Sequence, residues 1–115
     1  MINMKNITLP ALATALVILG AAPKAFADAK DNWTNNCAAC HGPDGTGHTK
    51  AGRMARVKNM ADATYQHGFT DEQAAKRIKE GLKDPTGKER MKPFGDKFSD
   101  DEIKALVDYV RSFQK

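Results

Sequence analysis

Residues 35–45 read NNCAACHGPDG and contain both cysteines of this 115-residue chain. Cys37 and Cys40 are separated by two alanines, and His41 follows the second cysteine directly. Neither thiol has another cysteine elsewhere in the chain with which it could pair. Two thiols and one imidazole packed this closely are the strongest chemical signal in the sequence, and four interpretations compete for it.

Three of these interpretations explain the unit poorly. A disulfide between Cys37 and Cys40 would close a loop too short to add much stability, and it leaves His41 without a role. A thioredoxin-like redox pair requires a neighbouring βαβ pattern, and the sequence shows none. A zinc site would need two of the three histidines, but His48 and His67 lack the spacing of zinc fingers, roughly 12 to 15 residues beyond the second cysteine.

The fourth interpretation is covalent haem attachment, in which the two thiols add to the haem vinyl groups and the adjacent imidazole binds the iron. The two-residue spacing lets both sulfur atoms reach one edge of the porphyrin while His41 points to its centre. The small side chains of Ala38 and Ala39 let the backbone approach the ring. The sequence therefore predicts one haem c bonded to Cys37 and Cys40, with His41 as an axial ligand of the iron.

A second axial ligand is needed, and five side chains after residue 27 could supply it: Met54, Met60, Met91, His48 and His67. Met91 lies in a loop where Pro93 fixes its own φ and restricts the residue before it, so the backbone near the sulfur is stiff. Phe94 can pack near the ring and exclude water. We therefore predict Met91 as the second axial ligand and place Pro93 and Phe94 in the haem pocket. His67 is the main alternative ligand.

The first 27 residues have the pattern of a secretory signal peptide. Lys5 supplies a positive start, residues 7–22 are almost wholly apolar, and Ala25-Phe26-Ala27 fits the small-x-small cleavage pattern. The apolar run has 16 residues, whereas a membrane-spanning helix needs about 20. We expect cleavage after Ala27, which leaves residues 28–115 as a monohaem domain in the bacterial periplasm, without a membrane span.

The composition after residue 27 indicates that side chains alone do not fill the interior. Only eleven of these 88 residues are Leu, Ile, Val or Phe, below the roughly 20% typical of a self-sufficient core. A large apolar porphyrin bonded to the chain would supply the missing material. Removing Lys5 and Lys24 lowers the formal net charge from +4 to +2, too small a balance to indicate nucleic-acid binding.

Three segments have helical patterns, at residues 29–39, 70–81 and 99–113. The second begins with Thr70 and Gln73 and the third with Ser99 and Glu102, and each of these pairs forms a capping box. Gly81 is expected to end the second helix. No run alternates with period two, so no strand is predicted, and residues 83–98 are expected to form a long loop without regular structure.

With these features the chain resembles the class I c-type cytochromes, small carriers with a single haem. The resemblance covers residues 28–115 and rests on CAACHG at 37–42, PDGTG at 43–47, RMKPFG at 90–95 and IKALVDYVRSF at 103–113. It implies an all-α fold of three to five short helices wrapped around one covalent haem. In such a fold the first and last helices cross, which would bring Trp33 into the haem pocket near Leu106, Tyr109 and Val110.

The resemblance also assigns ligands and shows two departures. Met91 matches the family's axial methionine, and Pro93 and Phe94 match its following proline and aromatic residue, although Lys92 lengthens the common Met-Pro pair. Family members often use a proline carbonyl to accept the hydrogen bond of the ligand histidine, and no proline lies between residues 43 and 85. Residues 51–60 are expected to supply that carbonyl instead.

Two occupied axial positions leave no site for a substrate at the iron, so we expect a carrier of single electrons and no enzyme activity. Its partners would be electron-donor and electron-acceptor proteins, and the carrier would act as a monomer. Basic residues near both predicted haem loops suggest docking to an acidic partner surface: Lys50, Arg53, Arg56, Lys58, Lys88, Arg90, Lys92 and Lys97. Two other functions stay open, a haem enzyme or gas sensor with a labile second ligand, and a zinc or thiol module.

Overall fold

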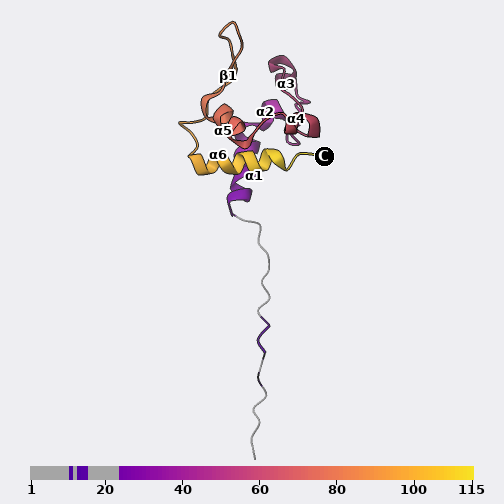
Figure 1. Cartoon of the computed structure of the whole chain (residues 1–115), viewed down its shortest axis with the longest axis vertical. Helices are drawn as coiled ribbons and strands as arrows, with labels where there is room; N and C mark the ends of the chain where they lie inside the picture. The colour runs from indigo at the N-terminus through magenta and orange to yellow at the C-terminus, as the bar shows by residue number, and fades with distance from the viewer. Residues whose placement is uncertain (1–10, 12, 16–23) are drawn as a thin grey trace, which may run out of the picture.

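The computed structural model describes residues 11, 13–15 and 24–115 (Figure 1). Most of the expected signal peptide, at residues 1–10, 12 and 16–23, lies outside the described residues, so its cleavage remains a prediction. In the part of the chain that is described, no helix is long and apolar enough to cross a membrane.

Six helices and one small hairpin make up the described chain. In sequence order they are α1 (Lys24–Asn36), α2 (Ala38–His41), α3 (Lys50–Ala55), α4 (Ala63–His67), α5 (Asp71–Glu80), β1 (Leu82–Lys83), β2 (Glu89–Met91) and α6 (Asp100–Arg111). The all-α class is confirmed, with one helix more than the three to five expected. Helix α1 starts before the predicted residue 29 and stops at Asn36, and Cys37 separates it from the single turn of α2.

Local capping determines where α5 and α6 begin. The Thr70 hydroxyl accepts a hydrogen bond from the backbone N–H of Gln73 (3.1 Å), and the Gln73 side chain accepts one from the N–H of Thr70 (2.9 Å). Ser99 and Glu102 make the same reciprocal pair, at 3.2 and 3.1 Å. Both predicted capping boxes are confirmed, and α5 ends before Gly81, whose φ of 75° suits glycine.

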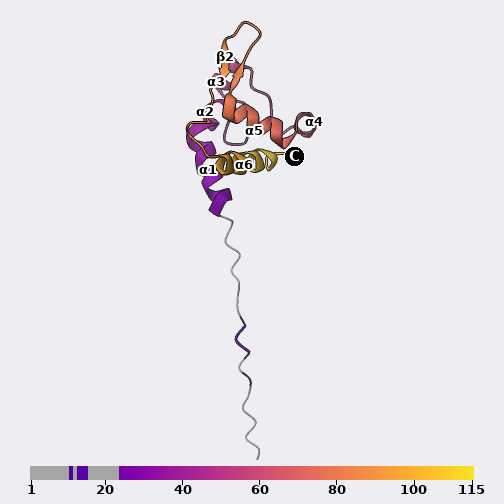
Figure 2. The ribbon, with the colours of Figure 1, turned by 60° about the vertical axis from the view of Figure 1, so that its left-hand side comes forward.

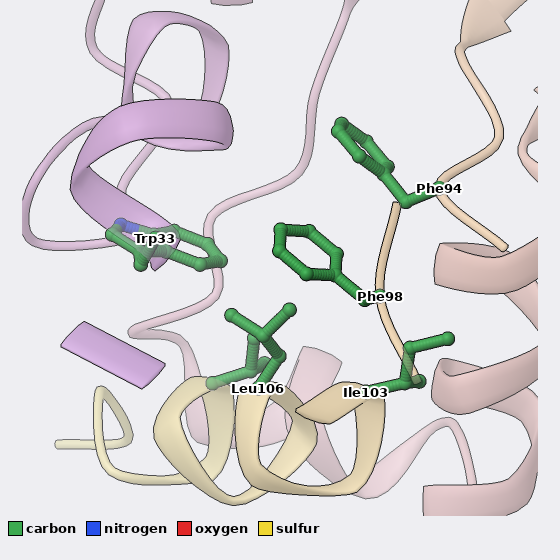
Figure 3. Close-up of a cluster of buried hydrophobic side chains, with 6 residues drawn as sticks. Trp33, Phe94, Phe98, Ile103 and Leu106 are labelled. Atoms are coloured by element: carbon green, nitrogen blue, oxygen red, sulfur yellow. The ribbon is translucent and has the colours of Figure 1, made fainter. Parts of the chain in front are cut away.

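The core lies where α1 and α6 cross (Figure 1). Its buried side chains are each at most 6% exposed and come from α1, from the segment before α6 and from α6 itself: Trp33, Phe94, Phe98, Ile103, Leu106 and Val110. Figure 3 shows the Phe98 ring between Trp33 and Ile103. The ring centroids of Trp33 and Tyr109 lie 5.9 Å apart, which confirms the predicted crossing.

The prediction of no strand is wrong, because the structure contains two short strands. The prediction that residues 83–98 lack regular structure is therefore wrong for residues 83–91. β1 and β2 pair antiparallel as a hairpin, which projects away from α6 in both views (Figure 1, Figure 2). Strands of two and three residues are too short to show an alternating pattern in the sequence. The turn also depends on the side chain of Asp84 and not on an Asn-Gly or Asp-Gly pair, so the usual hairpin signal is missing.

A buried polar side chain ties the middle of the chain to α6. Gln66 is 0% exposed, and its amide nitrogen donates to the carbonyl oxygens of Met60 (2.6 Å) and Val110 (2.8 Å). Its side-chain oxygen accepts from Arg111 at 2.9 Å, and Arg111 also donates to the carboxylate of Asp71 at 2.8 Å. Because every polar group of Gln66 is paired, this network can rigidify the segment from α4 to α5 against α6.

Candidate haem site

A cavity of about 1010 Å³ opens beside the core. This volume lies at the upper end of the range of roughly 300 to 1,000 Å³ typical of sites for small molecules. All six helices of the described chain, the hairpin and the segments between them contribute to the walls. The lining includes many apolar side chains: Trp33, Val57, Met60, Phe69, Ile78, Leu82, Phe94, Phe98, Leu106 and Val110. A cavity of this size and lining suits a large apolar cofactor.

Cys37, Cys40 and His41 all line this cavity. The carbonyl oxygen of Cys37 accepts hydrogen bonds from the backbone N–H groups of Cys40 (3.2 Å) and His41 (2.9 Å), so a single helical turn carries all three side chains. Both thiols are free and half-buried. Burial raises the pKa of the Cys37 thiol to about 11, and the neighbouring Cys40 adds to the increase. A thiol that stays protonated at pH 7 is a poor redox nucleophile, which disfavours the thioredoxin-like interpretation.

The zinc interpretation also finds no support in the structure. Among the described residues, no group of three or more His, Cys, Asp or Glu side chains is arranged to hold a metal ion. His48 and His67 are both exposed and do not line the cavity that contains Cys37 and Cys40. The two thiols and His41 are therefore not completed into a tetrahedral site by either histidine.

His41 is half-buried, in a state that can bind a metal. Burial lowers the pKa of its imidazole, so the ring is neutral and keeps a lone pair. Its Nδ1 atom is buried without a hydrogen-bond partner, and the carbonyl expected from residues 51–60 does not accept from it in the structure. The Trp33 ring packs beside the imidazole, with centroids 5.5 Å apart. This half-buried ring lines the cavity beside two thiols, so it could bind a haem iron through Nε2 while the proton stays on the buried Nδ1.

Close packing between α2 and α3 fixes the position of the Cys-x-x-Cys-His unit. The Thr49 hydroxyl donates to the carbonyl oxygen of Cys40 (2.9 Å) and also caps α3 by accepting from the N–H of Gly52 (2.8 Å). A Cβ atom at Gly52 would overlap the carbonyl oxygen of Cys40 and would lie 2.6 Å from that of Gly47. Glycine at this position therefore allows the contact, and the sequence alone gave no signal of it.

Met91 lines the same cavity from the end of β2. After it the chain is anchored to α5, because the N–H of Phe94 donates to the carbonyl of Ile78 (3.0 Å). Phe94, one predicted pocket residue, is 5% exposed and lines the cavity. Pro93, the other, is exposed and is not part of the cavity lining. As a proline it still fixes its own φ and so restricts the backbone close to Met91.

The other candidate ligands differ in their exposure and in whether they line the cavity. His67 is exposed, and its Nε2 atom lies 3.4 Å from the side-chain nitrogen of Gln114, outside the cavity lining. Met54 is 71% exposed. Met60 does line the cavity and packs against the core, so it is the second thioether within this site. The fold thus reduces the five candidates to Met91 and Met60.

Basic side chains gather at the cavity, although not in the full set predicted. Six cationic and two acidic residues belong to its lining, Arg56, Lys58, Lys76, Arg77, Arg90 and Lys92 against Glu80 and Glu89. We call these six the cationic rim. Four of them come from the loops singled out in the sequence, while Lys50, Arg53, Lys88 and Lys97 lie elsewhere. Lys76 and Arg77 on α5 were not predicted, because basic residues on a helix usually mark only a solvent-exposed face.

Comparisons with known proteins agree with this geometry. The sequence model of the cytochrome c family matches residues 26–114. A solved structure described as KustC0563 c-type cytochrome is similar over 76% of this chain and 98% of its own, with 36% sequence identity and a TM-score of 0.67. A tyrosine-to-phenylalanine mutant of that protein matches over 76% of this chain and 99% of its own, with 36% identity and a TM-score of 0.65. No curated protein matches the chain.

The family model covers the segment in which Cys37, Cys40 and His41 share one cavity with Met91. The first of the two solved structures shares 36% sequence identity with this chain over nearly its whole length, so the similarity extends beyond the fold to the sequence. This chain belongs to the cytochrome c family and carries one covalently bound haem c.

Proposed function

We propose that the protein is a periplasmic carrier of single electrons whose haem c is attached through Cys37 and Cys40 and bound at the iron by His41 and Met91. The observation that supports this assignment is that all four side chains line one cavity. Membership of the cytochrome c family supports a haem-based electron carrier. The haem would supply a one-electron Fe(III)/Fe(II) couple.

The residues of this chain would hold the cofactor and keep water from it. Both thiols reach the cavity from one helical turn, as two thioether bonds to one porphyrin edge require. Phe94 and Phe98 stack with their ring centroids 5.8 Å apart and close the core side of the cavity. Two buried aromatic rings at this wall would limit the access of water to the haem.

A carrier with both axial positions filled offers no place for a substrate to bind the iron, so we propose no enzyme activity. Thioether ligation also raises the reduction potential relative to two nitrogen ligands. The alternative, a haem enzyme or gas sensor with a labile second ligand, differs only in how firmly Met91 is held. Ligand exchange at the iron therefore separates the two functions.

Replacing Met91 by alanine should abolish the weak sulfur-to-iron absorption band of the ferric protein and open the ferrous iron to carbon monoxide. We also expect a lower reduction potential, because the thioether that favours ferrous iron is lost. Met60→Ala is the matched control, since it removes the other thioether that lines the cavity. A band that survives in Met91→Ala and disappears in Met60→Ala would reassign the ligand to Met60.

For the signal peptide we propose cleavage after Ala27. This cleavage would remove Phe26, whose ring packs edge-on against Tyr109 with centroids 5.4 Å apart. The small residues at 25 and 27 support this site. The product would be residues 28–115, a periplasmic monomer whose intact mass reports both the cleavage and the haem.

We further propose that the cationic rim steers the carrier to redox partners with acidic docking surfaces. The six cationic residues at the cavity outnumber the two acidic ones, and within the described chain only Arg90 among the six forms an ion pair, with Asp84, so positive charge would be concentrated at the cavity. The association rate with an acidic partner should fall as ionic strength rises, because salt screens charges beyond about 10 Å at 0.1 M. Lys76→Glu should lower this rate and weaken its salt dependence. Lys104→Glu, on exposed α6 surface outside the rim, should change it less; equal effects of both variants would reject a localised docking site.

A further inference from the structure

The hairpin that carries Met91 is too short to set its own register firmly. Two residue pairs define it, Leu82 with Met91 and Lys83 with Glu89, and beyond them one backbone hydrogen bond joins the N–H of Asp84 to the carbonyl of Lys88 at 2.9 Å. One step along β1 therefore corresponds to two steps along β2, so Arg90 is an extra residue and forms a β-bulge directly before Met91. Since strand side chains alternate between faces, a slip by one residue would turn the Met91 side chain away from the cavity.

The carboxylate of Asp84 organises the turn of this hairpin. One of its oxygen atoms, Oδ1, accepts hydrogen bonds from the N–H (2.9 Å) and hydroxyl (2.6 Å) of Thr86 and from the N–H of Lys88 (3.1 Å). These contacts, led by the Thr86 hydroxyl, lower the pKa of Asp84 to about 2. The carboxylate is therefore charged throughout the neutral range.

The other oxygen of Asp84 binds the bulged residue. Oδ2 accepts a hydrogen bond from Nε of Arg90 at 3.0 Å, and the two side chains are only 17% and 30% exposed. The cavity lining includes four consecutive residues of this segment, Glu89, Arg90, Met91 and Lys92. The extra residue, Arg90, directly precedes Met91, and a bulge at this point bends the strand and redirects the neighbouring side chains.

We propose that the Asp84–Arg90 ion pair is a positioning device that pins the bulge and thereby aims the Met91 sulfur into the haem cavity. The inference rests on the proposed role of Met91 as an axial ligand. Beyond Met91 the chain is held to α5 through Phe94 and Gly95. Before it, Asp84 provides the contact that joins the turn to the bulge. Loss of this contact would free the sulfur to leave the iron without unfolding the helical core.

Two variants break the pair from opposite sides. Asp84→Asn keeps Oδ1 as an acceptor for Thr86 and Lys88, but its amide nitrogen cannot accept from Arg90. Arg90→Gln removes the guanidinium and leaves the carboxylate turn intact. The direct effects of the lost charges on the reduction potential have opposite signs, because one variant removes a negative and the other a positive charge near the haem. A loss of positioning instead changes ligand exchange in the same direction in both.

Both variants should retain covalent haem and helical circular dichroism, weaken the sulfur-to-iron band and bind carbon monoxide in the ferrous state about tenfold faster than the wild type. Asp44→Asn is the matched control. Asp44 makes the same local contacts with Thr46, to its N–H at 3.1 Å and its hydroxyl at 2.8 Å, but within the described chain it forms no ion pair with an arginine. This control should match the wild type.

Wild-type band strength and carbon monoxide binding in both variants would overturn the positioning role, even if their potentials moved in opposite directions. The same holds if Asp84→Asn loses its fold while Arg90→Gln behaves as the wild type, because Asp84 would then serve the turn alone. Failure of the ligand assignment looks different. In that case Met91→Ala itself would keep the sulfur-to-iron band, and this result would overturn both the ligand assignment and the positioning role. A band that is lost in Met91→Ala but kept at wild-type strength in Asp84→Asn and Arg90→Gln would overturn only the positioning role.

Discussion

Replacing both Cys37 and Cys40 by serine should yield a polypeptide without covalent haem that is mostly unfolded at room temperature. The reason is the small amount of apolar material in the core. The buried apolar side chains of the described residues are concentrated at the α1–α6 crossing, beside a cavity of about 1010 Å³. At roughly 24 cal/mol per Å³ of unfilled interior, a fifth of this volume left empty would cost about 5 kcal/mol, comparable to the whole stability of a small domain.

Intact mass under denaturing conditions and far-ultraviolet circular dichroism test this expectation. The exported wild type should have the mass of residues 28–115 plus one haem, which also tests cleavage after Ala27. Each single variant, Cys37→Ser or Cys40→Ser, keeps one attachment point and should retain part of the haem and of the helical signal. A double variant that still carried haem after denaturation, or that folded to native helicity without it, would contradict the assignment of these thiols.

The attachment site could be predicted from the sequence because its chemistry is local. Cys37, Cys40 and His41 lie within five consecutive residues, and one helical turn is enough to bring their side chains together. The proposed second ligand, Met91, is different, since it lies 50 residues after His41. The stiff backbone before Pro93 pointed to Met91, but only the fold shows that His67 faces away from the cavity and that Met60 lines it.

The secondary structure likewise divides into elements that local patterns predict and contacts that only the fold shows. The starts of α5 and α6 were predicted correctly because a capping box involves residues three apart. The hairpin was missed because its turn is organised by the side chain of Asp84 and its two short strands contain a bulge, so no alternating pattern reveals it. Gln66 and Arg111 were missed as well, since their hydrogen bonds join residues about 45 positions apart. Contacts that depend on the assembled fold leave no local trace in the sequence.

Gly52→Ala should destabilise the haem protein by about 3 kcal/mol, at the upper end of the usual cost of overpacking. Helix propensity alone predicts the opposite sign, because alanine inside a helix is favoured over glycine by roughly 0.5 to 1 kcal/mol. Gly52 lies within α3, so the two effects compete at this position. The steric effect should win because the new methyl group would meet the backbone carbonyls of Cys40 and Gly47, which cannot rotate away as a side chain can.

Denaturant unfolding of the haem protein gives the sign directly. Relief of the overlap would push α3 away from α2 and strain the Thr49 contact to Cys40, so incomplete haem attachment should accompany the lower stability. Gly68→Ala is the matched control, since its φ is −82° and its new methyl would lie 3.2 Å from the nearest carbonyl oxygen, that of Tyr65. That variant should change stability by less than about 1 kcal/mol. A stabilised Gly52→Ala protein would show that α3 is free to move and that its packing does not position the haem-binding turn.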